Sequence, residues 1–310
     1  MRPCEAFREY VQHTGMFFQY PARTEEVFAT LMPEDAPYMP IPWATIIDKR
    51  CDLDRLRNSL AFICATVDPH ATITCCQHIH WRRLLPLMTS LGIRTVYTPH
   101  KLRGEDLIDG VRIIACPLFA VNVEDRAFAS LGTEIAPPAH RDLIYSFIGA
   151  YAAHYISDVR ARLFKMAHPV DAIVRSIDEW HLESVVYTSH QNAQGSIQAD
   201  PMRDARTAEY NHVMRRSMFA LCPSGAGPNT IRFWEALAFG AVPVILSDGM
   251  CLPATADGDD WDACTVQLGE DRLATLEATL RAIPAEVVAL KREACVRMYG
   301  RYGLHGARNN

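Results

Sequence analysis

Arg232 and Glu235 are three residues apart and follow a glycine-bearing loop in the second half of the chain. Residues at this spacing share one face of a helix, so both side chains are predicted near the start of the same helix. Arginine offers a planar fork of donors that suits a diphosphate, and a carboxylate can accept hydrogen bonds from neighbouring hydroxyls such as those of a ribose. The pair therefore fits a nucleoside diphosphate, and an ordinary ion pair on a helix face is the alternative.

The loop before this pair, residues 224–228, contains two glycines. Glycine lets backbone N–H groups approach a ligand closely, because no Cβ stands in the way. Asn229 or Thr230 is a natural N-cap for the following helix, and a helix N-terminus favours an anion. The residues expected to contact the phosphates of such a ligand are Ser224, Gly225, Gly227, Asn229 and Thr230.

A strand–loop–helix–strand unit must hold these residues. The apolar run 219–222 ends at turn residues, as expected of a buried parallel strand. Gly240 is predicted to end the helix, and residues 242–246 return as a second buried strand. In a doubly wound sheet, ligands bind at the carboxyl ends of such strands.

The same segment resembles the signature of exostosin-type glycosyltransferases. Their pattern is a tyrosine, then R-S-x-F-x-L-C-P-x-G, a short loop, R-x-x-E-A-L, and G-x-x-P-V-I-L-S-D. The matching positions here are Tyr210, Arg216, Ser217, Phe219, Leu221–Pro223, Gly225, Arg232, Glu235–Leu237, Gly240 and Pro243–Asp248. Upstream, Phe147 with Gly149 and Arg160 with Leu163 resemble two shorter elements of the family, which adds Gly149 and Arg160 to the expected donor site.

The resemblance implies an α/β fold of the GT-B type, in which two Rossmann-like, doubly wound domains face each other across a cleft. It also implies transfer of a hexose, uronic acid or pentose, with inversion, from a nucleoside diphosphate sugar to a glycan hydroxyl. We expect a UDP-linked donor. Arg232, the loop amides and Arg160 would stabilise the leaving diphosphate, so no metal or other cofactor is expected.

Length and composition agree with a globular enzyme of two domains. The 310 residues are 49% hydrophobic and 22% charged, and we expect an acceptor-side domain at 1–141 and a nucleotide-sugar-binding domain at 142–310. The formal net charge of −5 argues against a nucleic-acid partner. A charged N-terminus and the lack of a long apolar run predict a cytoplasmic protein without a membrane span.

The remaining elements are predicted from periodicity. Residues 1–45, rich in proline, are expected to be irregular. Strands are expected at 72–76, 94–98, 111–116, 143–148 and 185–188, and helices at 80–91, 157–167, 208–217, 273–282 and 285–299. The ten cysteines include no C-x-x-C pair and are expected to be reduced thiols.

The catalytic base is expected in the N-terminal domain, because the donor occupies the other one. His78 and His100 each follow a predicted strand, and an imidazole is suited to take a proton from an acceptor hydroxyl. We nominate His78 as the base. The rival residues are His100, His70, Glu134 and Asp68.

Two other classes of function remain open at this point. The chain could be a noncatalytic nucleotide- or glycan-binding relative that keeps the donor loop. It could also be a dinucleotide-dependent oxidoreductase, although it lacks G-x-G-x-x-G after an early strand and Gly225 with Gly227 is a weak substitute.

Overall fold

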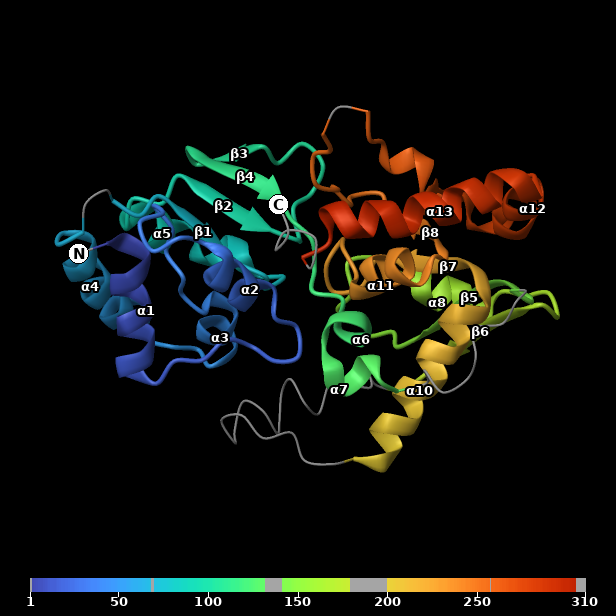
Figure 1. Cartoon of the computed structure of the whole chain (residues 1–310), viewed down its shortest axis with the longest axis horizontal. Helices are drawn as coiled ribbons and strands as arrows, with labels where there is room; N and C mark the ends of the chain where they lie inside the picture. Colours follow the sequence, from blue (N-terminus) through green and yellow to red (C-terminus); the bar gives the residue numbers. More distant parts are fainter. Residues whose placement is uncertain (1, 68–69, 132–140, 179–199, 257, 305–310) are drawn as a thin grey trace. The chain divides into compact units, whose positions relative to one another are not determined.

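The computed structural model describes residues 2–67, 70–131, 141–178, 200–256 and 258–304 (Figure 1). The chain splits into two compact units, Met1–Pro117 and Leu118–Asn310. The sequence analysis placed the boundary later, after residue 141. The division comes earlier because the short helices α6 (Val121–Glu124) and α7 (Arg126–Ala129) pack against α11 and α10 of the second unit.

The sheet of the first unit has the strand order β1-β2-β4-β3 in the described part of the chain. β1, β2 and β4 are parallel, and the edge strand β3 is antiparallel to β4. A 3₁₀ turn, η1, and helix α5 connect β1 to β2. The three strands predicted here and the helical stretch between them are therefore confirmed. The bounds are β1 Ile73–Cys75, η1 Trp81–Leu84, α5 Leu85–Ser90, β2 Thr95–Thr98, β3 Leu107–Ile108 and β4 Val111–Ala115.

The prediction that residues 1–45 are irregular holds for 15–23 and 32–42 and is wrong for the rest, because helices α1, α2 and the start of α3 lie there. Proline does not exclude a helix at its start, where the missing N–H is tolerated. Pro3 lies in the first turn of α1, and Pro42 is the N-cap of α3. In α1, Cys4, Phe7 and Val11 have helical spacing and are buried. The helices before β1 are α1 Pro3–Thr14, α2 Thr24–Leu31, α3 Trp43–Asp48 and α4 Leu53–Cys64.

The second unit contains a parallel sheet in the order β6-β5-β7-β8-β9. Three of these strands, β5, β7 and β8, are buried except for Met218 of β7 and confirm the predictions at 143–148, 219–222 and 242–246. The sequence analysis missed β6, a half-buried edge strand, and the short β9; its strand at 185–188 lies outside the described residues. The bounds are β5 Leu143–Gly149, β6 Ala172–Ser176, β7 Ser217–Pro223, β8 Val242–Leu246 and β9 Val266–Gln267.

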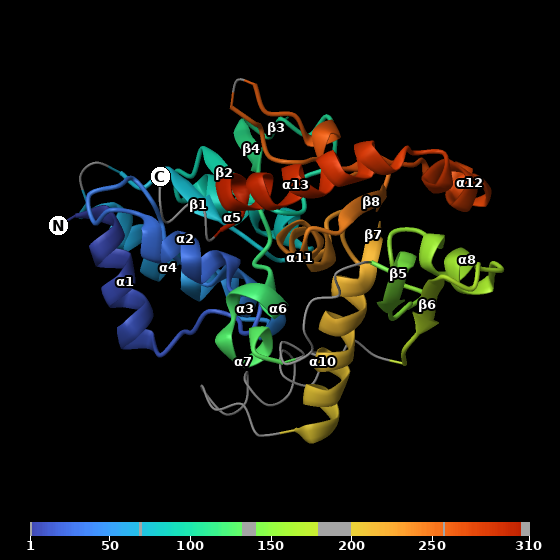
Figure 2. The ribbon, with the colours of Figure 1, turned by 45° about the vertical axis from the view of Figure 1, so that its right-hand side comes forward.

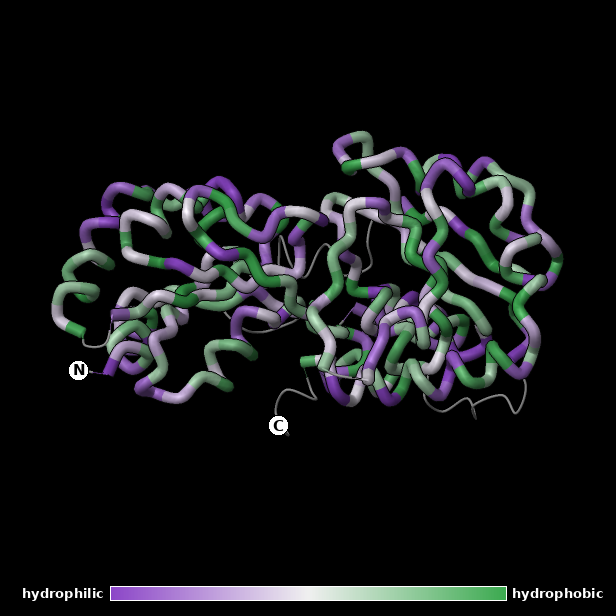
Figure 3. The backbone as a smooth tube through the Cα atoms, turned by 90° about the horizontal axis from the view of Figure 1, so that it is seen from above, coloured by the Kyte–Doolittle hydropathy of each residue, from purple (hydrophilic) through white to green (hydrophobic). Residues whose placement is uncertain are grey.

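Helices cover this sheet. α13 lies against α11 and also contacts β8, as Figures 1 and 2 show. In Figure 3, hydrophobic stretches of the backbone (green) run through the interior of the unit. The helical elements of the unit are α8 Val159–Lys165, α10 Pro201–Arg216, α11 Ile231–Phe239, η3 Trp261–Ala263, η4 Glu270–Thr275, α12 Leu276–Arg281 and α13 Ala285–Tyr302. None of the helices in the described ranges is long and apolar enough to cross a bilayer.

The order of the strands creates one special position on this sheet. From β5 the chain continues through α8 to β6 on one side, and it then returns through α10 to β7 on the other side of β5. The carboxyl ends of β5 and β7 therefore lie next to each other where the direction of winding reverses. Such a switch point is where open α/β sheets bind their ligands. In both units helices connect parallel strands, so the α/β class predicted from the sequence is confirmed.

Candidate functional site

Helix α11 starts directly after the glycine-bearing loop. Thr230 is its N-cap, with extended backbone (φ −134°, ψ 141°), but its side chain makes no capping hydrogen bond. The side-chain oxygen of Asn229 instead accepts the Thr230 N–H at 2.8 Å. Gly240 ends the helix in the left-handed conformation at φ 64°, as predicted, where a side chain would be strained.

Arg232 points from the first turn of α11 toward the end of β5. Its side chain is buried, and its Nη2 donates a hydrogen bond to the carbonyl of Ile148. The guanidinium carbon lies 4.4 Å from the ring centre of Phe147 and 5.4 Å from that of Tyr210. Aromatic faces on two sides and a carbonyl thus fix the orientation of the cation.

Arg160, in the first turn of α8, reaches the same strand ends. Its Nε donates to the carbonyl of Ser224 at 2.8 Å, Nη1 to that of Ala150 at 3.0 Å, and Nη2 to that of Pro223 at 3.3 Å. Its guanidinium lies 5.4 Å from the ring centre of Phe147. Arg160 therefore joins the segment after β5 to the loop after β7.

Arg160 and Arg232, which we call the arginine pair, both lie against Phe147. Burial and, next, the positive charge of Arg232 lower the pKa of Arg160 to about 10. Among the described residues, no carboxylate lies within ion-pair distance of either guanidinium. Arg232 is buried and Arg160 is half-buried, so their positive charges repel each other across a partly desolvated space, and a bound dianion such as a diphosphate would relieve this repulsion.

Two glycines leave room for the arginine pair. A Cβ at Gly225 would lie 2.8 Å from Nη2 of Arg160. A Cβ at Gly149 would lie 3.0 Å from Cζ of Phe147 and 3.4 Å from Nη2 of Arg232. The N–H of Gly225 donates to the carbonyl of Gly227 at 3.0 Å, which closes the loop on itself. Gly149 thus lies beside Arg232 and Gly225 beside Arg160, and Gly227 is hydrogen-bonded to Gly225.

Ser224 has a different surrounding from the one expected. Its side chain is fully buried, and its hydroxyl lies 3.0 Å from that of Ser157 and 3.2 Å from Oε1 of Glu270. The backbone N–H of Glu270 in turn donates to Asp248 at 3.1 Å. Ser224 therefore fastens the loop to neighbouring elements. The sequence analysis missed Glu270, because no local pattern relates it to a loop 46 residues earlier.

Glu235 also has protein partners that the sequence did not reveal. Its Oε1 accepts hydrogen bonds from the backbone N–H and the side-chain Nδ2 of Asn122, at 3.0 and 2.8 Å, and its Oε2 accepts one from the Tyr210 hydroxyl at 2.7 Å. Burial raises the pKa of this carboxyl. The expected contact of Glu235 with ribose hydroxyls is not supported by this geometry, since the buried carboxylate is engaged by three donors.

The first unit contains the residues nominated for the base. The Nδ1 of His78 accepts the backbone N–H of His80 at 2.9 Å, so Nε2 carries the proton and donates to Asp48 at 3.0 Å. Neither ring nitrogen then offers a lone pair to an acceptor hydroxyl, which argues against His78 as the base.

Of the rivals, His100 is buried, and this burial, followed by the charges of His78 and Arg82, lowers its pKa to about 3. Its Nδ1 has no hydrogen-bond partner among the described residues. His70 is exposed, with its Nδ1 3.2 Å from the carbonyl of Cys64. Glu134 and Asp68 lie outside the described residues.

Aspartates spaced as Asp-x-Asp occur at Asp52 and Asp54, at Asp257 and Asp259, and at Asp260 and Asp262, and Asp257 lies outside the described residues. In the first and the last of these the first carboxylate caps a helix: Asp52 accepts from two N–H groups of α4, and Asp260 accepts from the N–H of Asp262. In the part of the chain that the structure describes, no three His, Cys, Asp or Glu side chains are grouped to hold a metal ion.

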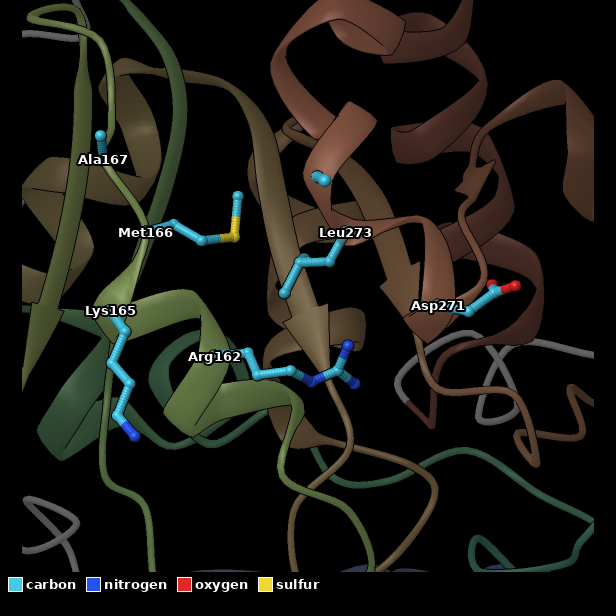
Figure 4. A pocket seen from close by; sticks show the side chains of 7 residues that line it. Arg162, Lys165, Met166, Ala167, Asp271 and Leu273 are labelled. Atoms are coloured by element: carbon cyan, nitrogen blue, oxygen red, sulfur yellow. The ribbon is translucent and has the colours of Figure 1, made fainter.

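A separate cavity of about 510 Å³ lies between α8 and η4 (Figure 4). Met166 and Leu273 face each other across it, and Arg162 and Lys165 extend from α8 at its edge. None of the residues predicted to bind the donor lines this cavity.

The family model for the Exostosin GT47 domain matches residues 72–283. The probable glucuronosyltransferase GUT1 of Oryza sativa subsp. japonica is 38% identical over 95 residues, 30% of this chain and 22% of that protein. The probable beta-1,4-xylosyltransferase IRX10 of Arabidopsis thaliana is 37% identical over 95 residues, again 30% of this chain and 23% of the relative.

A longer match reaches Exostosin-1 of Drosophila melanogaster, 27% identical over 196 residues, 61% of this chain. The aligned region is 24% of the length of Exostosin-1. The matches to the two plant proteins likewise span less than a quarter of their length.

Proposed function

Since this chain belongs to the exostosin GT47 family, we propose that it is a glycosyltransferase that moves a sugar from a nucleoside diphosphate sugar to a hydroxyl of a glycan. Relatives named as glucuronosyltransferase and xylosyltransferase favour a uronic acid or a pentose as the sugar. The proposal extends to a UDP-linked donor, to inversion, and to a GT-B-like division in which the second unit binds the donor and the first the acceptor. In this proposal the enzyme acts in polysaccharide synthesis.

The arginine pair is the observation that carries this proposal. Both guanidiniums lie at the carboxyl ends of β5 and β7, at the switch point of the sheet, where a nucleotide is expected. Backbone carbonyls and the ring of Phe147 hold them in place before any ligand binds.

This arrangement suits the departure of a diphosphate. As the bond between the sugar and the diphosphate breaks, negative charge grows on the phosphate oxygens, and positioned cations stabilise it without reorganising. With a pKa of about 10, Arg160 stays protonated at neutral pH despite its neighbour. In this proposal two arginines do what a divalent cation does in other transferases, so turnover needs no metal.

Activity is tested with a panel of UDP-sugars, scored for release of UDP with and without candidate oligosaccharide acceptors. Arg232→Ala should lower turnover by about 10²-fold or more, and Arg232→Lys should recover only part, because an ammonium lacks the planar fork. The matched control is Arg281→Ala, which removes an exposed arginine of the same unit that pairs with Asp171 and Glu277.

Three results would contradict the proposal. A wild-type rate in Arg232→Ala would remove the role of the arginine pair. UDP binding without sugar transfer from any donor would identify a noncatalytic relative. Reduction of a nicotinamide dinucleotide without sugar transfer would point to an oxidoreductase.

A further inference from the structure

Three further arginines gather at the C-terminal end of α11. Nη2 of Arg141 donates to the carbonyl of Phe239, and Nε of Arg292 donates to the carbonyl of Gly240 at 3.1 Å. The guanidinium carbon of Arg215 lies 4.8 Å from the ring centre of Phe239. We call Arg141, Arg215 and Arg292 the arginine cluster. They come from the residue pair before β5, the end of α10 and the middle of α13, so only the fold brings them together.

The arginine cluster lies at the amino ends of the central strands. Arg141 comes shortly before β5, Arg215 shortly before β7 and Gly240 shortly before β8. The arginine pair lies at the carboxyl ends of the same sheet. Because β5 and β7 are each seven residues long, about 20 Å separates the two edges. The two groups of cations therefore cannot share one bound anion.

The charge of the arginine cluster is not balanced by the protein. Among the described residues, no carboxylate lies within ion-pair distance of its three guanidiniums. Asp142, the neighbour of Arg141 in the chain, instead accepts hydrogen bonds from Nε and Nη2 of Arg216. Burial lowers the pKa of Arg141 to about 10, and the charges of Arg292 and Arg215 contribute to this decrease. At neutral pH Arg141 is still protonated, so three positive charges face one another.

Backbone carbonyls compensate this charge only in part. Arg141 also donates from Nη1 to the carbonyls of Met214 at 3.2 Å and Ser217 at 2.5 Å, and the carbonyls at a helix C-terminus favour a cation. The Nε of Arg215, however, is buried and has no hydrogen-bond partner in the part of the chain that the structure describes. A buried donor of a charged group without an acceptor is unfavourable, and an oxygen atom of a ligand would supply that acceptor.

We propose that the arginine cluster binds a tetrahedral oxyanion, the phosphate or sulfate group of a small ion or ester. A carboxylate is satisfied by a single bidentate arginine, as the pair of Asp142 and Arg216 shows. Three guanidiniums around one place suit an ion with more oxygens and a charge near −2. The inference does not depend on the proposed function, because it uses no residue of the donor site.

The test titrates the full chain, carrying isotope-labelled arginine side chains, with inorganic phosphate and follows the Nε–H signal of Arg215 by NMR. This signal is identified as the one that is absent from Arg215→Lys. It should shift in a saturable way, and sodium chloride at the same ionic strength should not reproduce the shift. Phosphate bound at the arginine pair is about 20 Å away and should not move this signal, so Arg232→Ala should titrate like the wild type.

A second variant tests whether the cations act together. Arg292→Gln should weaken phosphate binding at Arg215 by about tenfold, because hydrogen bonds from a charged donor are the strong ones. The matched control is Arg281→Gln, which removes the same charge from an exposed arginine of this unit that pairs with Asp171 and Glu277. It should leave the dissociation constant within about twofold.

Inorganic sulfate and glycerophosphate identify the source of the group. Sulfate and phosphate that bind alike, and at least as tightly as the ester, would indicate a free ion. Glycerophosphate that binds about tenfold more tightly than either ion would indicate an ester. Both results support an oxyanion site at the arginine cluster.

Four results would overturn the inference. A signal of Arg215 that phosphate does not move would show that the cluster binds no oxyanion, and an equal shift in chloride would show only screening. Loss of the shift in Arg232→Ala would place the bound ion at the arginine pair. Unchanged affinity in Arg292→Gln would show that the cluster does not act as one site. If this variant does not fold, Arg292→Lys takes its place and should bind phosphate a few fold more weakly, because an ammonium keeps the charge and lacks the planar fork.

Discussion

At the scale of single residues, Glu235 already forms hydrogen bonds within the protein, and these occupy the oxygen atoms that a substrate hydroxyl would need. Glu235 holds Asn122 and Tyr210, and Tyr210 in turn lies beside the guanidinium of Arg232. The carboxylate thus keeps the surroundings of the arginine in order. An interpretation based on residue type alone, in which a carboxylate near a diphosphate site binds a ribose, did not include these donors.

His78 provides a prediction at this scale. Removing it breaks a hydrogen bond with Asp48 in a mostly buried setting, so His78→Ala should lower the free energy of unfolding by about 1–3 kcal/mol. Because both ring nitrogens are occupied, turnover should fall less than about tenfold, whereas loss of a general base costs about a hundredfold or more. Steady-state rates and thermal unfolding of the same samples decide the matter. A hundredfold slower enzyme with unchanged stability would restore His78 as the base.

At the scale of elements, one buried carboxyl connects three segments of the first unit. Glu25, in the first turn of α2, accepts the N–H of Ala44 at the start of α3 at 3.1 Å and that of Gln77 after β1 at 3.0 Å. Its own N–H donates to the side chain of Gln77 at 2.9 Å. Burial raises the pKa of Glu25 from its ordinary value of 4.5 to about 8.

This shift predicts a dependence of stability on pH. The folded chain keeps a proton that the unfolded chain releases above pH 4.5, so the contribution of Glu25 is fully present below about 4.5 and is lost as the pH rises through about 8. In between, one proton changes the free energy of unfolding by at most about 1.4 kcal/mol per pH unit. Thermal unfolding from pH 5 to pH 9 should show this decline, and Glu25→Gln should flatten it.

The matched control is Glu293→Gln, which alters an exposed glutamate of α13 and should leave the pH profile as it is. If the wild type and Glu25→Gln lose stability with the same slope, Glu25 is ionised in the folded chain at neutral pH and the three segments are joined by a carboxylate.

At the scale of the whole molecule, the charge balance explains why local cations matter. The chain has a formal net charge of −5, so its overall field does not attract an anionic donor. The attraction must come from the arginine pair, which acts at short range in a desolvated place. A few residues, and not the charge of the whole surface, then bind the diphosphate.

Metal removal tests this view. If the arginine pair neutralises the leaving diphosphate, sugar transfer in excess EDTA should stay within about twofold of the untreated rate, because no cation has to be bound for each turnover. The control is the same sample with manganese added back. A large loss in EDTA that manganese reverses would show that a divalent cation shares the charge of the diphosphate.

The sequence alone determined the elements around the donor motif. Strands β5, β7 and β8, helix α11 and its end at Gly240 follow from short-range patterns: apolar runs, helical spacing and a glycine directly after the helical run. Such patterns involve neighbours within a few residues, so they can be recognised without knowing the fold. The same reasoning failed for the helices within residues 1–45, where prolines at helix starts resembled the prolines of irregular structure.

Only the tertiary structure decided what those elements do together. Pairing of β5 with β7 brings Arg160 to the carbonyl of Ser224, 64 residues away, and packing of α6 on α11 brings Asn122 to Glu235, 113 residues away. No local pattern contains such contacts, because they form only when the sheet and its helices close over a shared core. The residue types could be recognised in the chain, but their charges, partners and free lone pairs depend on which distant segments burial places against them.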